Sequence, residues 1–210
     1  MELTCETPAP GLRVWQPKRG YRFGVEVYAL AAFALGESGG PPLAPPTRAL
    51  ELGCGSGVVS LLLAWRGVEM VAVERQAAWM PVARRNAEES GMPVTIVEGD
   101  IRTLSILSEL VVCNPPWFPA DQPMSPDPMK AASRAMLHGD VRDFAEAGLR
   151  CAPRVCVVTR REREHDLGGH YVARRAELGR ELVLLELQRD ACVRRDEPLD
   201  LPACYAAFGR

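Results

Sequence analysis

The chain has 210 residues, of which 47% are hydrophobic and 25% are charged, which is the balance of a globular protein with one main domain and a short appendage. The net charge of -2 excludes a generally basic surface, so any contact with nucleic acid needs a local basic patch. No apolar run is long enough to span a membrane, the N-terminus lacks a signal-peptide core, and the seven cysteines include no CxxC pair, so we expect a reduced, cytoplasmic protein.

The N-terminal region reads as an appendage. Glycines and prolines interrupt residues 1–24, which predicts irregular structure, and residues 25–35 predict an apolar helix. A glycine- and proline-rich connector, residues 36–47, follows. We therefore expect an appendage over residues 1–46 that covers the functional site, and a main domain over residues 47–210.

The main domain alternates short apolar strands with helices. Strands are predicted at 48–52, 68–73, 94–98, 109–113, 154–159, 181–187 and 203–208, and helices at 57–66, 77–90, 130–151 and 170–179. This alternation predicts the α/β class, with a seven-stranded, mostly parallel sheet and helices on both faces. The last two strands have no helix between them, so we expect them to form an antiparallel hairpin at the sheet edge.

A glycine-rich turn follows the first strand of the main domain. Glu51 precedes it, and Gly53, Cys54, Gly55 and Gly57 form it. Glycines let a backbone bend sharply and approach a ligand closely. A nicotinamide cofactor is disfavoured, because the third glycine comes one residue early and a carboxylate suits a pyrophosphate poorly. A cationic ligand such as S-adenosylmethionine, with its sulfonium and ammonium groups, fits better. The pattern E-x-G-x-G-x-G resembles the first motif of class I methyltransferases, which have a Rossmann-like fold.

Acidic residues follow the next two strands. Glu74 ends the second strand and is expected to accept hydrogen bonds from ribose hydroxyls. Asp100, after the third strand, is expected to accept from the exocyclic amine of the cofactor's adenine, with the backbone amide of Ile101 beside it. Taken singly, each acid reads as a solvated loop residue, but acids at the ends of successive strands predict a shared ligand site.

The fourth strand ends in Asn114, Pro115, Pro116, Trp117 and Phe118. The prolines fix the backbone, so the side-chain carbonyl of Asn114 and the backbone carbonyl of Pro115 can converge on one NH2 group. Trp117 can stack on a planar substrate. A delocalised amine or amide nitrogen needs alignment and proton acceptors more than a strong base. The motif resembles the [DNS]-P-P-[YFW] signature of methyltransferases that act on base amines or on glutamine, and Asn114 is expected to contact the cofactor as well.

Residues 15–150 resemble the bacterial tRNA adenine-N6 methyltransferase family. The pattern Q-x-x-x-G-Y-R-F-x-x-[DE] begins at Gln16 and precedes the apolar helix, the glycine turn and N-P-P-aromatic-F. The resemblance implies that Gln16, Tyr21, Arg22 and Phe23 cover the cofactor or shape the pocket, and Tyr21, Arg22, Phe23, Trp117 and Phe118 are expected to contact substrate. Members modify an adenine in the anticodon loop of a valine tRNA.

Other interpretations stay open at this stage. The resemblance implies S-adenosylmethionine as cofactor, tRNA as partner, and a monomer or small homo-oligomer with no membrane contact. A protein glutamine or small-molecule amine N-methyltransferase shares the same motifs, and a cofactor-binding scaffold without activity is the alternative of another class. His165 and His170 lack ligand partners in the sequence, so we expect no metal. Residues 119–130, with their prolines, read as a substrate-facing loop or a simple connector.

Overall fold

The computed structural model describes residues 2–19, 22–116, 140–167, 171–190 and 193–210. In chain order the elements are β1 (Leu3–Ala9), β2 (Leu12–Pro17), α1 (Val25–Leu35), β3 (Arg48–Leu52), α2 (Val58–Trp65), β4 (Glu69–Glu74), α3 (Met80–Ser90), β5 (Val94–Glu98), β6 (Leu110–Cys113), α5 (Val141–Cys151), β7 (Arg154–Arg160), the 3-10 helix η1 (Arg161–Leu167), β8 (Val172–Leu178), β9 (Leu182–Leu187), β10 (Arg195–Glu197) and α6 (Leu201–Ala206).

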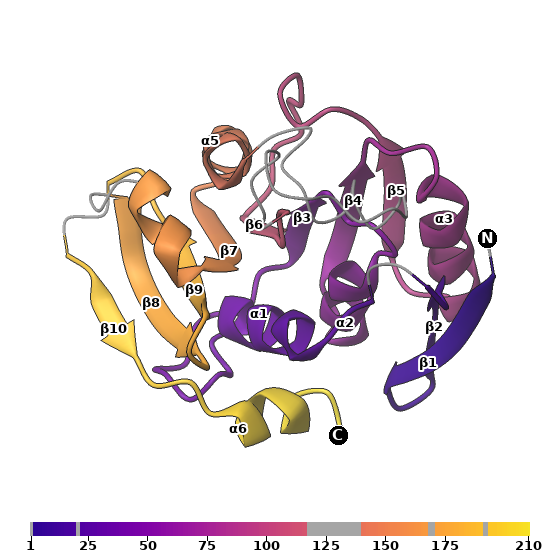
Figure 1. The fold of residues 1–210 in the computed structure, drawn as a ribbon, viewed down its shortest axis with the longest axis horizontal. Coiled ribbons are helices and arrows are strands. Elements are labelled where there is room, and N and C mark those ends of the chain that lie inside the picture. Colours follow the sequence, from indigo (N-terminus) through magenta and orange to yellow (C-terminus); the bar gives the residue numbers. More distant parts are fainter. Residues whose placement is uncertain (1, 20–21, 117–139, 168–170, 191–192) are drawn as a thin grey trace.

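One large sheet organises the fold, in the order β10-β8-β9-β7-β6-β3-β4-β5 (Figure 1). Neighbouring strands are parallel except at β9, which runs antiparallel to both β7 and β8. The predicted α/β class and the mostly parallel sheet are confirmed, and an antiparallel hairpin lies near one edge, although β8 and β9 form it. The described sheet has eight strands in place of the predicted seven.

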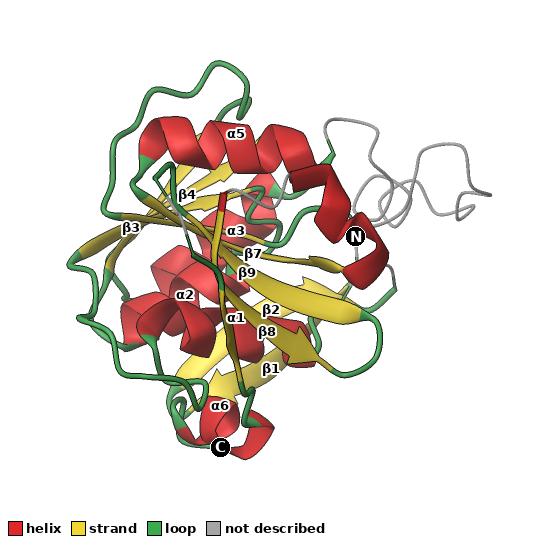
Figure 2. Cartoon of the chain, turned by 90° about the vertical axis from the view of Figure 1, so that its left-hand side faces the viewer, coloured by secondary structure: helices red, strands yellow, loops and turns green. Residues whose placement is uncertain are grey.

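Helices cover both faces of the sheet, because the strand residues that point to each face are apolar. Helices α1 and α2 pack on one face with Ala49 and Val112, and α5 packs on the other with Leu50 and Val111 (Figure 2). Helix α1 is buried on nearly all sides, as its sequence predicts, since apart from Glu26 in the first turn its residues are apolar or aromatic. None of the described helices is long and apolar enough to cross a membrane.

The prediction of irregular structure over residues 1–24 was wrong for its first part. Strands β1 and β2 form an antiparallel hairpin that lies beside α3 (Figure 1). Leu12 and Val14, which are fully buried, alternate with the exposed Arg13 and the half-buried Trp15. The alternation of a half-buried strand was therefore present, but the run is short and flanked by glycines and prolines.

The predicted helix over 170–179 was also wrong, because residues 172–178 form β8. Alanine, arginine and glutamate favour helices in isolation. Here Arg174 and Arg175 are buried in ion pairs on opposite faces of the strand, to Glu186 and to Glu164 respectively. Tertiary pairing thus overrides local propensity.

The predicted strand over 203–208 is replaced by helix α6. Asp200 caps the helix by accepting the amide of Ala203 at 3.2 Å, and Cys204 and Phe208, four residues apart, are buried. The hairpin predicted from the last two strands is therefore formed instead by β8 and β9. The long helix predicted over 130–151 begins, where it is described, only at Val141, because Asp140 is an extended N-cap.

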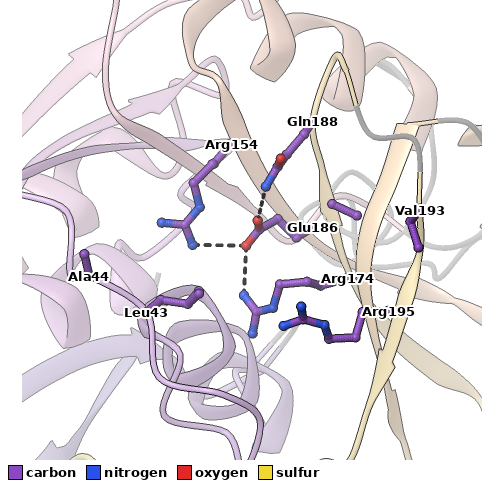
Figure 3. A pocket seen from close by; sticks show the side chains of 9 residues that line it. Leu43, Ala44, Arg154, Arg174, Glu186, Gln188, Val193 and Arg195 are labelled. Atoms are coloured by element: carbon purple, nitrogen blue, oxygen red, sulfur yellow. Dashed lines mark hydrogen bonds and ion pairs between the residues drawn. The ribbon is translucent and has the colours of Figure 1, made fainter.

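A buried ionic network joins β7, β8, β9 and β10. Figure 3 shows the part of this network that surrounds Glu186. Arg174 donates to Glu186 at 2.8 Å and to Glu197 at 2.8 Å, and Arg154 donates to the same Glu186 oxygen at 3.0 Å. The two arginines also donate to the Phe33 and Ala34 carbonyls at the end of α1. A cavity of about 430 Å³ lies against this network. The cavity lies near the amino ends of β7 and β8, whereas the glycine turn follows the carboxyl end of β3. It is therefore separate from the candidate site.

Replacing Arg174 by Met should lower the free energy of unfolding by about 3 kcal/mol, because two buried carboxylates lose their main partner. Arg195→Met is the matched control: this neighbouring side chain is 62% exposed and should change stability by less than about 0.5 kcal/mol. Urea denaturation of both variants measures the difference. Equal effects of the two substitutions would contradict a structural role for the network.

Candidate functional site

The turn from β3 into α2 has a backbone that only glycine adopts readily. Gly53, Gly55 and Gly57 have φ of 70°, 55° and 79°, in the left-handed region. The amides of Gly53 and Cys54 donate to the carbonyl of Val73 at 2.8 and 3.0 Å, which ties the turn to β4. A side chain at Gly55 or Gly57 would meet no described atom within 4 Å. The turn therefore borders open space in which a ligand can approach the backbone.

Glu51 lies beneath this turn and is only 3% exposed. Its carboxylate accepts the backbone amide of Ser60 at 2.9 Å and the Ser60 hydroxyl at 2.5 Å, both from the first turn of α2. Burial raises the pKa of Glu51 from 4.5 to about 7, although the two hydrogen bonds from Ser60 oppose this and the nearby carboxylate of Glu74 adds to it. The predicted residue is thus at the site, supporting the turn from below.

Glu74, at the end of β4, also holds the turn. One of its carboxylate oxygens accepts the amide of Gly55 at 2.8 Å, and the other accepts the amides of Arg75 and Gln76 at 2.8 and 2.7 Å. The side chain is buried. Two carboxylates from neighbouring strands therefore meet under one glycine turn, which makes the local environment favourable to a cation.

Asp100 lies at the same edge of the sheet but already has partners. Arg102 donates to it from Nε at 2.9 Å and from its backbone amide at 3.0 Å, and Arg75 lies 3.2 Å away. These bonds, those from Arg102 above all, lower the pKa of Asp100. The side chain of Ile101 is buried, and its carbonyl accepts from Arg150 at 3.0 Å. An adenine amine at Asp100 would have to share the carboxylate with two arginines.

The register of the sheet brings the N-P-P element to the glycine turn. Leu52, the last residue of β3, pairs with the residue before Asn114 on β6 and with the residue before Glu74 on β4. Asn114 therefore leaves the sheet directly beside Gly53. Pro115 is buried, and Asn114 is half-buried. A nitrogen held at Asn114 would face a ligand held at the turn.

Two of the residues predicted to contact substrate, Arg22 and Phe23, already have partners within the chain. Arg22 is exposed and ion-paired with Glu6. Phe23 is half-buried against the core, and its amide donates to the side-chain oxygen of Gln16 at 3.2 Å. Tyr21, Trp117 and Phe118, and the loop over 119–130, lie outside the described residues.

Asn86 is a structural residue of the site that the sequence did not reveal. It is fully buried in the middle of α3. Its side-chain oxygen accepts the Trp15 amide at 2.7 Å, and its Nδ2 donates to the carbonyls of Trp15 and Ser56, both at 2.8 Å. One side chain thus joins the β1–β2 hairpin, α3 and the glycine turn. Asparagine is disfavoured inside helices, and this was the only available signal.

Residues 49–139 match the model of a methyltransferase domain. The chain is 35% identical over 114 residues to the tRNA1(Val) (adenine(37)-N6)-methyltransferase of Aeromonas hydrophila, covering 50% of this chain and 47% of that protein. It is 34% identical over 114 residues to the release factor glutamine methyltransferase of Geobacter sulfurreducens, covering 50% and 39%. The chain spans about half the length of the curated relatives it matches.

Solved structures share the fold. TrmN from Thermus thermophilus superposes with a TM-score of 0.55 at 21% identity, covering 77% of this chain and 47% of that chain. Magnesium protoporphyrin IX methyltransferase from Synechocystis PCC 6803, solved with bound S-adenosylmethionine, gives a TM-score of 0.55 at 18% identity, covering 81% and 86%. Among the described residues, no three His, Cys, Asp or Glu side chains cluster as a metal site would require.

Replacing Asn86 by Ala should lower the free energy of unfolding by about 2 kcal/mol, because the buried amide and carbonyl of Trp15 lose their partner. Hydrogen exchange at the Trp15 amide should accelerate in step. Glu89→Gln is the control, since Glu89 contacts Trp15 only through an exposed bond to its indole Nε1. Unchanged protection of Trp15 in Asn86→Ala would show that the hairpin is held elsewhere.

Glu51→Gln should remove a pH dependence of stability. The folded chain holds the Glu51 proton more tightly than the unfolded chain, so this contribution is present at low pH and is lost as the pH rises through about 7. Relative to the wild type, Glu51→Gln should gain about 2 kcal/mol of unfolding free energy between about pH 5 and about pH 8. A constant difference across this range, measured by urea denaturation, would mean that Glu51 titrates normally.

The sequence, the order of the strands and the positions of the strand ends all indicate the same kind of domain. The order β5-β4-β3-β6-β7 of parallel strands, with antiparallel β9 beside them, places the glycine turn and the N-P-P element next to each other at one edge. Residues 49–139 therefore resemble a methyltransferase domain, and the chain is similar to class I S-adenosylmethionine-dependent methyltransferases, including relatives named as tRNA1(Val) adenine-N6 enzymes.

Proposed function

We propose that the chain is a cytoplasmic S-adenosylmethionine-dependent N-methyltransferase that acts on the exocyclic amine of an adenine in tRNA. The observation that carries the proposal is the position of Asn114 beside Gly53, which puts an amine-binding element next to the cofactor turn. The names of the relatives at 35% identity support adenine in tRNA as the target.

The described residues fit the cofactor. Gly55 and Gly57 leave an open cradle, and the carboxylates of Glu51 and Glu74 lie beneath it, where they favour a sulfonium and an ammonium group. We assign cofactor binding to the residues expected from the sequence: Glu51, Gly53, Cys54, Gly55, Gly57, Glu74, Asp100, Ile101 and Asn114. When bound, S-adenosylmethionine supplies the methyl group through its sulfonium.

The chain's own residues then act on the target nitrogen. Asn114 Oδ1 and the Pro115 carbonyl would accept the two N–H bonds of the amine and turn its lone pair toward the methyl carbon. As the nitrogen gains the methyl group, these acceptors would stabilise its positive charge until one proton leaves to water. Pro116 limits the motion of the backbone, and Trp117 is assigned to stacking on the base.

The N-terminal residues complete the proposal. We assign residues 1–46 to covering the site and residues 47–210 to catalysis, although α1 shares one core with the sheet. The β1–β2 hairpin lies beside the glycine turn and carries exposed Arg13, Lys18 and Arg19. Such cations can contact phosphates while an adenine swings out of an RNA loop into the site.

Glutamine methylation is the second candidate, because a release factor glutamine methyltransferase matches the chain at 34% identity. Its target is also a planar NH2 group, so the geometry at Asn114 serves both reactions. The substrate alone separates them.

The purified chain, incubated with methyl-labelled S-adenosylmethionine, should label unmodified total tRNA. Asn114→Ala should reduce this labelling at least about 100-fold, because the nucleophile loses its alignment, while cofactor affinity changes little. Gln188→Ala, at the opposite sheet edge, is the control and should keep full activity.

Ribosomal RNA and protein extract are labelled in parallel. Label in protein instead of tRNA would replace the adenine proposal with glutamine methylation. Cofactor binding without labelling of any of these substrates would support a small-molecule amine substrate or a scaffold without activity.

A further inference from the structure

The cavity near the amino ends of β7 and β8 is lined by more cations than anions (Figure 3). Its volume of about 430 Å³ is in the range of small-molecule sites. Arg154, Arg174 and Arg195 line it, together with a single carboxylate, that of Glu186. These side chains surround a space that the proposed methyl transfer does not use.

The sheet register directs these side chains to one face of the sheet. Arg195 on β10 is paired with Arg174 on β8, and Arg174 is paired with Glu186 on β9. Side chains alternate along a strand, so residues paired in this way share a face. In Figure 3 the side chains of Arg174 and Arg195 lie side by side, and their guanidinium groups point toward Leu43 in the connector after α1. The backbone therefore determines which charges meet at the cavity.

The two carboxylates of the ionic network already have their partners. One oxygen of Glu186 accepts from Arg154 and Arg174 at 3.0 and 2.8 Å, and the other accepts from Gln188 at 2.6 Å. Glu197 accepts from Arg174 Nε and Nη2 at 3.0 and 2.8 Å. Burial opposes the charged form of Glu186, but the two arginines outweigh it and lower the pKa, so this carboxylate stays ionised.

Positive charge remains in excess after this pairing. The three arginines of the cavity are balanced by two carboxylates, those of Glu186 and Glu197. The carbonyls of Phe33 and Ala34, at the end of α1, also accept from the arginines. A helix end of this kind contributes about half a negative charge, so roughly half a positive charge is left at the cavity. Such a surplus favours a singly charged anion over a doubly charged one.

Arg195 and Arg154 have donors that no described residue uses. The carboxylate of Glu197 lies 4.0 Å from Arg195, beyond hydrogen-bond distance, and the Arg195 side chain is 62% exposed. Within the described part of the chain, Arg154 donates from Nη2 alone, which leaves its Nε and Nη1 without acceptors. A guanidinium group with free donors forms a planar fork that fits both oxygens of a carboxylate.

The remaining lining of the cavity is apolar. Leu43 and Ala44 come from the connector, Ala173 comes from β8, and Val193 precedes β10. Val193 is 80% exposed, which leaves a large apolar side chain in contact with water. An apolar group of a ligand would be stabilised by covering Val193 and Leu43. The cavity thus combines a site for an anion with a site for an apolar body.

We infer that this cavity is a second ligand site, which binds a small organic carboxylate. The carboxylate accepts hydrogen bonds from Arg195, and the apolar body of the ligand lies against Leu43 and Val193. The unused donors of Arg154 add to the positive potential. The inference is independent of the proposed function, because the site is separate from the glycine turn and needs neither the cofactor nor methyl transfer.

Titration with benzoate, followed through the amide chemical shifts of the whole chain in NMR spectra, tests the inference. Benzoate is a carboxylate on a compact apolar body, and benzamide has nearly the same shape without the charge. At neutral pH and constant ionic strength, benzoate should shift the amides of Leu43, Ala44 and Arg195 along a saturable curve. Benzamide should bind at least about tenfold more weakly, because it lacks the charge-assisted hydrogen bonds.

Two variants separate binding in the cavity from general attraction to a charged surface. Arg195→Met should weaken benzoate at least about tenfold, since the carboxylate loses its donors, and the exposed side chain can be replaced without unfolding the chain. Arg180→Met is the matched control. Arg180 is exposed in the turn between β8 and β9, at the end of β8 away from the cavity, so this variant should bind benzoate like the wild type.

Three results would overturn the inference. Equal affinity for benzoate and benzamide would mean that the cavity does not select a charge. Benzoate affinity that is unchanged in Arg195→Met, or lowered equally in Arg180→Met, would place the anion on the general surface. Absence of a saturable shift at the cavity of the wild type would mean that no such site exists. Each of these results leaves the proposed function standing, because labelling of tRNA is measured separately.

Discussion

The turn between β3 and α2 is held from below by two buried carboxylates, and the rest of the site depends on this support. Glu51 accepts the amide and hydroxyl of Ser60, and Glu74 accepts the amide of Gly55. The turn adopts left-handed glycine conformations, and its outer side stays open. Burying two acids so close together is unfavourable, as the raised pKa of Glu51 shows. A cationic ligand above them would offset that cost.

From this turn, contacts extend to the other parts of the site. The sheet register places Asn114 beside Gly53. Asn86 joins the hairpin to the turn, because it donates to the carbonyls of Trp15 in the hairpin and Ser56 in the turn. The ionic network around Arg174 instead stabilises the opposite edge, where it also binds the end of α1. The residues that stabilise the fold through the Arg174 network therefore lie apart from the glycine turn and its open space.

The sequence predicted the parts that depend on local pattern. Strands and helices from residue 48 to residue 113 follow apolar periodicity and glycine punctuation, and their predicted bounds agree with the structure to within a few residues. The site residues there lie at strand ends, and a parallel sheet brings such ends together. The sequence therefore predicted that Glu51, Glu74 and Asn114 lie close together, which the sheet register confirms, while their roles stay predictions.

The missed features depend on contacts between distant segments. Strand β8 has the composition of a helix, but the ion pairs of Arg174 and Arg175 stabilise it as a strand. The β1–β2 hairpin is likewise joined to a distant segment, through Asn86 on α3. The partners of Asp100 are likewise tertiary, since Arg75 follows a different strand. Periodicity contains no information about such pairings.

Hydrogen exchange with and without S-adenosylmethionine tests most directly whether the glycine turn is the cofactor site. We predict slower exchange of the amides from Gly53 to Val59 when the cofactor is bound, and unchanged exchange in β10 at the opposite edge. Protection confined to β10 and the cavity beside it, or no protection at saturating cofactor, would contradict the assignment of the site.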